Sequence, residues 1–118
     1  KQKFKFIDIL KDFNFNLISC GGNKNNFKLR EQLTDGANSF TLEPGKIIMY
    51  NCNHQTIKEL EKNDYRHISS KALYYDQLTF EKILRSDSKV VISIDGSELV
   101  KGRGGPRCMT LPINRGLI

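Results

Sequence analysis

The stretch from Ser39 to Ile68 most restricts the folds open to this chain, because it carries strand and helix patterns in a definite order. Residues 39–42 alternate polar and apolar side chains, which is typical of a half-buried strand. The Glu-Pro-Gly sequence at 43–45 predicts a turn, since proline presets φ at the second turn position and glycine accepts positive φ at the third. Residues 46–50 are then predicted to be the partner strand of a hairpin.

A helix and a further strand complete this order. The helix is predicted over residues 56–62, with Asn51 or Asn53 as its N-terminal cap. Residues 65–68 suit the next strand. The order strand, strand, helix, strand predicts an α/β protein, and 118 residues are enough for one domain with a modest core.

The segment before this unit begins with an amphipathic pattern. Four apolar side chains recur with helical spacing from Phe6 to Phe13, which predicts a helix that stops near Asn16. Residues 17–18 are predicted to start a short strand, and composition predicts a loop over residues 21–26.

The segment after this unit alternates in the same way. A helix is predicted over residues 74–85, and the β-branched run at 90–94 suits a buried strand. Residues 102–107 are too rich in glycine for a helix or a strand. Residues 109–113 are apolar at alternate positions and are predicted to form a short final strand.

Composition and charge bear on whether this chain binds nucleic acid or a membrane. The net charge of +6 suggests an anionic partner, but the lysines are dispersed, and neither an arginine-rich arm nor an RNA-binding aromatic pattern accompanies them. We therefore expect no nucleic-acid partner. No apolar run approaches the roughly 20 residues that span a bilayer, and the opening residues 1–6 do not resemble a secretory signal. We expect a cytoplasmic protein without a membrane partner, and a piece of a longer one, since the chain does not open with Met.

The cysteines and histidines do not form a metal-binding pattern. Cys20, Cys52 and Cys108 are odd in number and widely spaced, which argues against both a disulfide framework and a zinc pair. His54 and His67 lack the spacing of metal ligands on a helix. We expect no structural or catalytic metal and no cofactor.

Cys108 is the candidate nucleophile. Three glycines, a proline and two arginines precede it within residues 102–107, which predicts a shaped polar loop around a thiol. The positive charge of the arginines would favour the thiolate, which is the reactive form. Two alternatives remain open at this point: Cys108 as a small buried hydrophobe, and the glycine-rich loop as a surface turn or phosphate cradle.

The segment from Gly96 to Thr110 closely resembles the C-terminal signature of arginine deiminases. The sequences CGG at 20–22, REQLTDGAN at 30–38 and LEPG at 42–45 also resemble that family, in the family's order. The resemblance covers nearly the whole chain. It implies that residues 1–118 are a C-terminal fragment of an arginine deiminase catalytic domain.

The resemblance implies a fold as well. Arginine deiminases are similar to a five-bladed α/β propeller (the pentein fold) built from strand-strand-helix-strand units, of which this chain would hold about one and a half to two. The terminal strands would then belong to a neighbouring unit or complete the ring. Residues 69–89 have no counterpart in the family pattern and are expected to be an inserted surface segment with one helix, peripheral to the chemistry.

The resemblance further implies hydrolysis of L-arginine to L-citrulline and ammonia through a covalent thiouronium intermediate. Cys108 would be the nucleophile. Arg103 would gate the site or contact substrate, the backbone of Gly102 would approach substrate, and Arg107 would act like Arg103. Asn38, in the loop that begins at Asp35, would line the site and bind substrate, with a purely structural turn as an alternative.

The resemblance leaves part of the family's chemistry outside this chain. The acidic residues that hold the guanidinium and the general acid-base histidine lie upstream in the family. His54 and His67 do not match that histidine, and we expect a solvated helix residue and a sheet-edge residue, respectively. The expected partners are L-arginine, the missing N-terminal portion and, through exposed faces, further copies of the chain.

Three alternatives differ in class. The chain could be a non-catalytic split or degenerate fragment that serves as a subunit or interaction module. It could also be an amidinotransferase or a methylarginine hydrolase, which the GRGGPRCM sequence at 102–109 disfavours. A basic nucleic-acid binder is the third.

Overall fold

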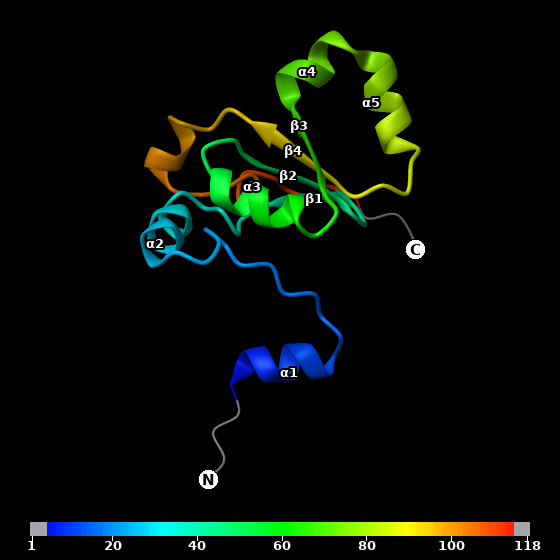
Figure 1. Cartoon of the computed structure of the whole chain (residues 1–118). Helices are drawn as coiled ribbons and strands as arrows, with labels where there is room; N and C mark the ends of the chain where they lie inside the picture. The colour runs from blue at the N-terminus through cyan, green and yellow to red at the C-terminus, as the bar shows by residue number, and fades with distance from the viewer. Residues whose placement is uncertain (1–4, 115–118) are drawn as a thin grey trace.

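The computed structural model describes residues 5–114, where four strands form one mixed sheet with helices on both faces (Figure 1). Residues 1–4 and 115–118, including most of the opening segment assessed for a secretory signal, lie outside the described residues. No helix in residues 5–114 is long and apolar enough to cross a membrane. The elements are, in chain order, α1 (Phe6–Asp12), α2 (Asn25–Leu33), β1 (Phe40–Glu43), β2 (Lys46–Tyr50), α3 (His54–Glu61), β3 (Arg66–Ser69), α4 (Ser70–Tyr75), α5 (Gln77–Leu84), β4 (Val90–Ile94) and the 3-10 helix η1 (Leu99–Gly102).

The sheet has the strand order β1-β2-β4-β3. β1 and β2 form the predicted antiparallel hairpin, and its turn places Gly45 at a φ of +80°. β2, β4 and β3 run parallel, with Ile48 and Ile68 both opposite Ile92. All four of these strands were predicted from local patterns, and the α/β class is confirmed.

The position of β4 corrects the expected unit count. β4 was expected to belong to a neighbouring unit, but it lies between β2 and β3, so the described residues hold a single sheet. The physical reason is burial, because Val90 and Val91 point to opposite faces and both are fully buried, as only a central strand allows. The final strand predicted at 109–113 is also wrong, since this segment pairs with no strand and leaves Leu111 and Ile113 exposed.

Each face of the sheet has its own apolar core. Successive residues of a strand point to opposite faces, so β4 contributes to both. On one face, α3 packs Ile57 and Leu60 on Met49 and Val91. On the other face, the side chains that pack together are Leu73 from α4, Ile83 from α5, and Val90 and Ile92 from β4. Figure 1 shows α3 and the α4–α5 pair on opposite sides of the sheet.

Residues 70–89 form the crossover that connects β3 to β4, and they hold two helices where one was expected. That this segment is an insertion peripheral to the chemistry stays a prediction. β3 and β4 are parallel neighbours, and such strands need a crossover connection of a dozen or more residues. The connection through α3 runs outward to β3, so the return to β4 must use the opposite face to keep the same hand. The single helix predicted over 74–85 is two helices, because Asp76 caps α5 by accepting from Thr79 N–H at 3.0 Å.

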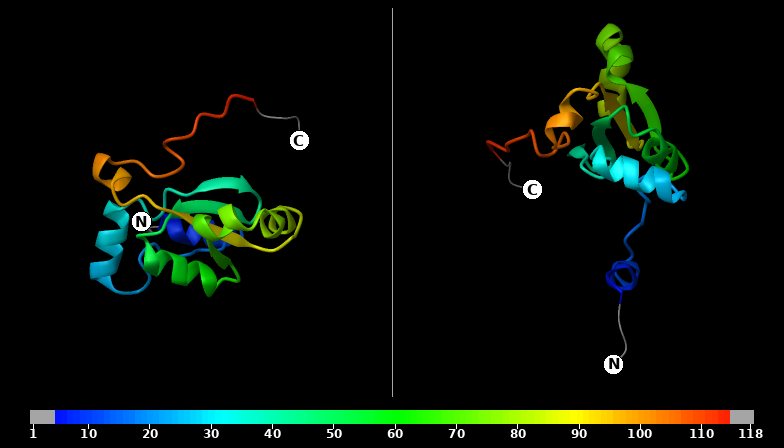
Figure 2. Two further views of the ribbon diagram at one scale, coloured as in Figure 1. Left: turned by 90° about the horizontal axis from the view of Figure 1, so that it is seen from above. Right: turned by 90° about the vertical axis from the view of Figure 1, so that its left-hand side faces the viewer.

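The N-terminal region differs most from its sequence pattern. The predicted helix exists as α1, but Phe6 and Phe13 are each 73% exposed, and α1 stands away from the sheet (Figures 1 and 2). The strand predicted at 17–18 is wrong, and the loop predicted over 21–26 ends where α2 begins at Asn25. α2 was missed because it has no continuous apolar stripe.

Glu31 explains how such a polar helix is held. Its side chain is fully buried, and its carboxylate accepts from Gln55 N–H at 2.9 Å, Thr56 N–H at 2.7 Å and the Thr56 hydroxyl at 2.8 Å. Glu31 on α2 therefore supplies the N-terminal cap of α3. Of the two predicted caps, Asn53 does occupy the N-cap position, but its side chain makes no capping hydrogen bond and exchanges hydrogen bonds with Thr34 instead.

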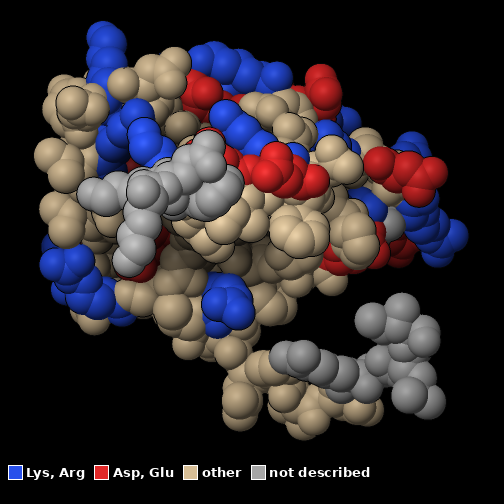
Figure 3. Space-filling view, turned by 90° about the horizontal axis from the view of Figure 1, so that it is seen from below, with Lys and Arg blue, Asp and Glu red and all other residues tan. Residues whose placement is uncertain are grey.

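The charged side chains are as dispersed on the surface as the lysines are along the sequence. On the face drawn in Figure 3, lysine and arginine side chains are interspersed with aspartate and glutamate rather than gathered into one basic patch. A nucleic-acid footprint would instead concentrate the positive charge on one surface. This face therefore gives no support to the basic nucleic-acid binder.

Replacing Glu31 should destabilise the fold. Burial acts to raise the pKa of Glu31, but the hydrogen bonds from the first turn of α3 and from Arg30 outweigh it and lower the pKa. Glu31→Gln leaves a buried N–H without its acceptor and should cost about 1.5–3 kcal/mol in urea unfolding at pH 7. Glu61→Gln, an equal charge change at an exposed site of α3, should cost less than about 0.5 kcal/mol.

The same pair gives a pH test. A depressed folded-state pKa stabilises the protein above the unfolded value of about 4.3, and this contribution disappears as pH falls through the folded value. The gap in stability between the parent chain and Glu31→Gln should therefore narrow on acidification below about pH 4. A gap that widens with acid would contradict the assigned role of the carboxylate.

The crossover predicts a second contrast, between two leucines of residues 69–89. Leu73 is 8% exposed against β4, whereas Leu78 is 72% exposed. Leu73→Ala should lower the free energy of unfolding by about 2–4 kcal/mol through the cavity it leaves. Leu78→Ala should change it by less than about 0.5 kcal/mol. Equal small effects in chemical denaturation would contradict a structural role for the crossover.

Candidate active site

Cys108 lies in a turn beyond the glycine-rich loop. η1 ends at Gly102, and the chain then passes through two residues with positive φ, Arg103 at +65° and Gly104 at +102°. Cys108 N–H donates to Gly105 C=O at 3.0 Å, which closes the turn, and the Cys108 side chain is exposed. The loop is neither helix nor strand after η1, as the glycine content indicated.

Gly104 fastens this loop to the rest of the fold at both of its backbone polar groups. Its N–H donates to Asp35 Oδ2 at 3.1 Å, and its C=O accepts from the hydroxyl of Tyr50 at 3.0 Å. Tyr50 is fully buried at the end of β2, and Gly96 packs on its ring so closely that a Cβ there would lie 2.1 Å from a ring carbon. The loop therefore sits on rigid elements.

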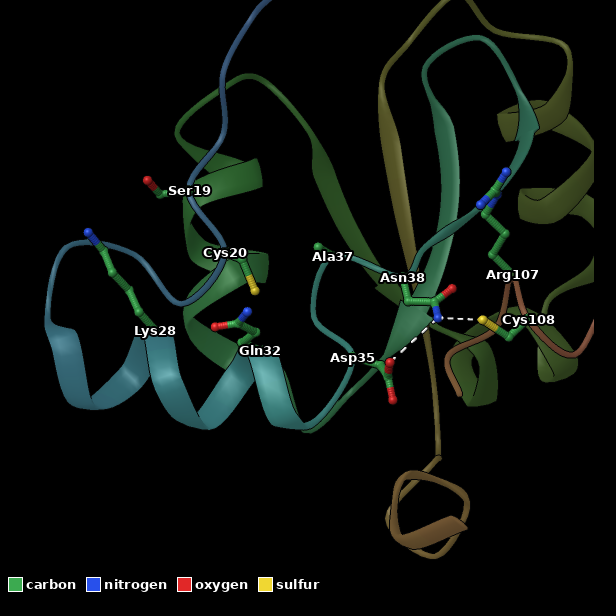
Figure 4. Close-up of a pocket in the computed structure, with 9 residues that line it drawn as sticks. All are labelled: Ser19, Cys20, Lys28, Gln32, Asp35, Ala37, Asn38, Arg107 and Cys108. Carbon is green, nitrogen blue, oxygen red and sulfur yellow. Dashed lines mark hydrogen bonds between the residues drawn. The ribbon is translucent and has the colours of Figure 1, made fainter. Parts of the chain in front are cut away.

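Asn38 lies against the nucleophile itself. Its side-chain Nδ2 lies 2.7 Å from Cys108 Sγ and 3.5 Å from Asp35 Oδ1 (Figure 4). The backbone of Asn38 also donates to Asp35 C=O at 2.9 Å. Gly105 is required here, because a Cβ at that position would come within 2.5 Å of the Asn38 Cβ.

Cys108 opens on a hollow of about 610 Å³. One wall carries Arg107 and Asn38, and Asp35 lines the hollow next to Asn38. The opposite wall carries Cys20 and, from α2, residues that include Lys28. Figure 4 shows these two walls separated by open space.

Three of the five predicted site residues meet at this hollow. Cys108, Arg107 and Asn38 line it, whereas Gly102 and Arg103 do not. Arg103 is exposed, and a Cβ at Gly102 would meet no atom within 4 Å. Their assigned substrate contacts remain predictions.

The far wall was missed by the sequence reasoning. Lys28 and Gln32 both line the hollow, one helical turn apart on α2. The i, i+4 spacing of these two residues indicates a shared helix face only if α2 is first recognised as a helix, and its polar sequence hides that. Cys20 and Gln32 lie within segments that resemble the family pattern, which was the available signal.

Histidine and metal chemistry have little support in residues 5–114. His54 is exposed in the first turn of α3, and His67 is exposed on the edge strand β3, where it bonds Ser93 Oγ at 2.9 Å; both placements were predicted. No group of three or more possible metal ligands occurs among the described residues. Asp35 is the one carboxylate among the described residues that line the hollow.

The buried Tyr50 phenol and the half-buried Cys52 thiol stay protonated at neutral pH. Burial, followed by the nearby negative charges of Asp35, Cys52 and Cys108, raises the pKa of Tyr50. Its hydroxyl therefore remains a donor to Gly104. Burial is also the main cause that raises the pKa of the Cys52 thiol, which keeps Cys52 in its unreactive form.

Comparison with known proteins agrees with the C-terminal motif. The family described as arginine deiminase matches residues 1–115. The chain belongs to the arginine deiminase family. The arginine deiminases of Streptococcus agalactiae serotype V (strain ATCC BAA-611 / 2603 V/R) and Streptococcus sanguinis (strain SK36) are 39% and 38% identical to it over 99 residues. Each match covers 84% of this chain and 18% of the relative, so this arginine deiminase chain spans about a fifth of their length.

Cys108 should be the most reactive thiol of this arginine deiminase chain. It is exposed, whereas Cys20 and Cys52 are half-buried and burial raises the pKa of Cys52. Iodoacetamide at neutral pH, followed by peptide mapping, should modify Cys108 first. Faster modification of Cys20 or Cys52 in the folded chain would contradict this ranking.

Proposed function

We propose that this chain is the nucleophile-bearing C-terminal portion of an arginine deiminase that hydrolyses L-arginine to L-citrulline and ammonia. The observation that carries the proposal is the exposed Cys108 sulphur, held at the mouth of the hollow by Asn38 in a chain of this family. Its location is expected to be cytoplasmic, and the proposed chemistry uses side chains and water alone.

In the first half of the proposed reaction, the Cys108 thiolate attacks the central carbon of the substrate guanidinium. The new C–S bond gives a tetrahedral intermediate. One C–N bond then breaks, and the nitrogen leaves as ammonia after it gains a proton. The product is an S-alkyl thiouronium, a covalent intermediate that divides one difficult hydrolysis into two easier steps.

In the second half, water adds to the thiouronium carbon and loses a proton. The C–S bond of this second tetrahedral intermediate breaks, and its electron pair returns to sulphur. The remaining hydroxyl loses its proton as the carbonyl forms, and citrulline leaves with the Cys108 thiolate restored. Arg107 lines the hollow, and its proposed roles are to favour the thiolate and to bind the substrate carboxylate. Arg103 and the Gly102 backbone keep their proposed roles at the entrance, since both are exposed and close to the anchored loop.

The rest of the enzyme has to supply what this portion lacks. A guanidinium needs carboxylates, and departing ammonia needs a proton donor. The chain covers 18% of its relatives, which leaves most of their length to carry these groups. We propose that β1, β2, α3 and β3 form one strand-strand-helix-strand unit of a five-bladed α/β propeller, to which β4 is added between β2 and β3. The N-terminal portion would complete the propeller.

A non-catalytic subunit is the second candidate. The observation that favours it is the exposed apolar surface at both ends of the described chain, where Phe6 and Phe13 are each 73% exposed and Leu111 is 84% exposed. Surfaces of this kind mark interaction sites. The same surface would also serve an enzyme whose remaining portion packs there, so catalysis decides between the two candidates.

Turnover should require both portions. The isolated chain should produce no measurable citrulline from arginine, because removal of several cooperating catalytic groups typically costs orders of magnitude. A mixture with the separately expressed N-terminal portion should restore it. Cys108→Ala in the mixture should abolish activity, whereas Cys52→Ala should leave most of it, because Cys52 does not line the hollow.

Two results would overturn the proposal. Appreciable turnover by the isolated chain would show that the missing groups are not needed. Full activity of the Cys108→Ala mixture would remove Cys108 from the reaction. A mixture that forms a stable complex without any turnover would favour the non-catalytic subunit.

A further inference from the structure

The hydrogen bond between Asn38 and Cys108 points to a role for Asn38 that the reaction steps above do not include. Asn38 Nδ2 is a donor only, so the sulphur at 2.7 Å must act as the acceptor. A thiol is a weak acceptor, whereas a charged acceptor forms a hydrogen bond roughly twice as strong as a neutral one. This contact therefore favours the thiolate over the thiol.

We propose that Asn38 is a positioning residue, which aims the Cys108 sulphur at the hollow and holds it as the thiolate through this N–H···S hydrogen bond. The inference rests on the proposed function, in which Cys108 is the nucleophile. It differs from the substrate contact expected from the family resemblance, because Asn38 acts here through the sulphur and not on arginine.

Asp35 selects the orientation of the Asn38 amide. The two hydrogens of Nδ2 serve two acceptors, Cys108 Sγ at 2.7 Å and Asp35 Oδ1 at 3.5 Å. A flipped amide would turn its carbonyl oxygen toward a carboxylate that can only accept, so the contact with Asp35 would be lost and the sulphur would face an acceptor, which suits only the thiol. The carboxylate thus keeps the N–H groups, and not the oxygen, directed at the sulphur.

The same carboxylate fixes the loop that carries the sulphur. Asp35 Oδ2 accepts from Gly104 N–H at 3.1 Å, four residues before Cys108. Gly105 then lies against Asn38, at a distance that only glycine permits. The Asp35 side chain therefore contacts both the Asn38 amide and the loop that carries the Cys108 sulphur.

The charges around Cys108 oppose one another. Arg107 and Lys28 bring positive charge to the walls of the hollow, whereas Asp35 brings a negative charge on the side of Asn38. Tyr50 faces the loop from β2 as a neutral phenol, and Cys20 faces the hollow from the far wall. The Asn38 amide lies between Asp35 and the sulphur, so a carboxylate in its place would add a second negative charge.

The test uses the complete enzyme, assembled from this chain and its N-terminal portion, with Asn38→Leu and Asn38→Asp. Asn38→Leu removes the donor at similar size, and Asn38→Asp removes it and adds charge. Asn23→Leu, at an exposed loop residue away from this hollow, is the matched control. For each variant, the measurements are kcat, KM, the urea midpoint and the iodoacetamide rate at Cys108 across pH.

Loss of a charge-assisted hydrogen bond should slow Cys108 alkylation at pH 7 by about tenfold or more in Asn38→Leu. The pH of half-maximal alkylation should rise by about one unit, and further in Asn38→Asp. The value of kcat should fall about tenfold or more, with KM within about threefold of the parent. Asn23→Leu should match the parent in every measurement.

Each remaining outcome overturns the proposal. An unchanged alkylation profile in folded variants would remove the thiolate role, and a raised KM with unchanged kcat would make Asn38 a substrate contact. Loss of the fold in both variants would make Asn38 a structural residue only. Failure of the proposed function is separate, because it would appear as undiminished turnover in Cys108→Ala, whatever the Asn38 variants do.

Discussion

Glu31 holds together the two halves of the chain that meet at the site. A buried carboxylate is costly unless it is hydrogen-bonded, and this one accepts three bonds from the first turn of α3. A negative charge at a helix N-terminus is also favoured by the helix dipole. The backbone C=O of Glu31 accepts from Gly36 N–H at 2.7 Å, so the loop after α2 is fixed at the same point. Asp35 and Asn38 belong to that loop, and their reach toward Cys108 depends on this anchor.

Cys108 is brought next to Asp35 and Asn38 by the C-terminal part of the chain. β4 runs parallel to β2, and its last residue lies opposite Tyr50. Gly96 follows two residues later and packs on the Tyr50 ring, and after η1 the chain returns so that Gly104 accepts from the Tyr50 hydroxyl. The α4–α5 crossover is remote from the hollow, yet it fixes where β4 lies and therefore where Cys108 can be placed.

Local patterns predicted the elements whose burial is simple. The hairpin, α3 and β4 follow from alternation and β-branching within a few residues, and the turn at Gly45 follows from its glycine. α2 was not predicted, because its buried side chain is a glutamate and does not contribute to an apolar pattern. The place of β4 in the sheet and the contact between Asn38 and Cys108, 70 residues apart, depend on long-range packing that local patterns do not encode. Cys108 was found because its loop has an unusual composition and resembles a family signature.

Presenting a thiolate and binding a guanidinium make opposite demands on the charge of a site. A thiolate is stabilised by cations and N–H donors, whereas a guanidinium requires carboxylates with free acceptor positions. In the part of the chain that is described, the hollow carries Arg107 and Lys28, and its one carboxylate, Asp35, already engages Gly104 and Asn38 with its two oxygens. These walls therefore suit the nucleophile and not the substrate's charged end. Carboxylates placed on a separate portion can face the hollow without lying beside the sulphur, which reconciles the two demands in one site.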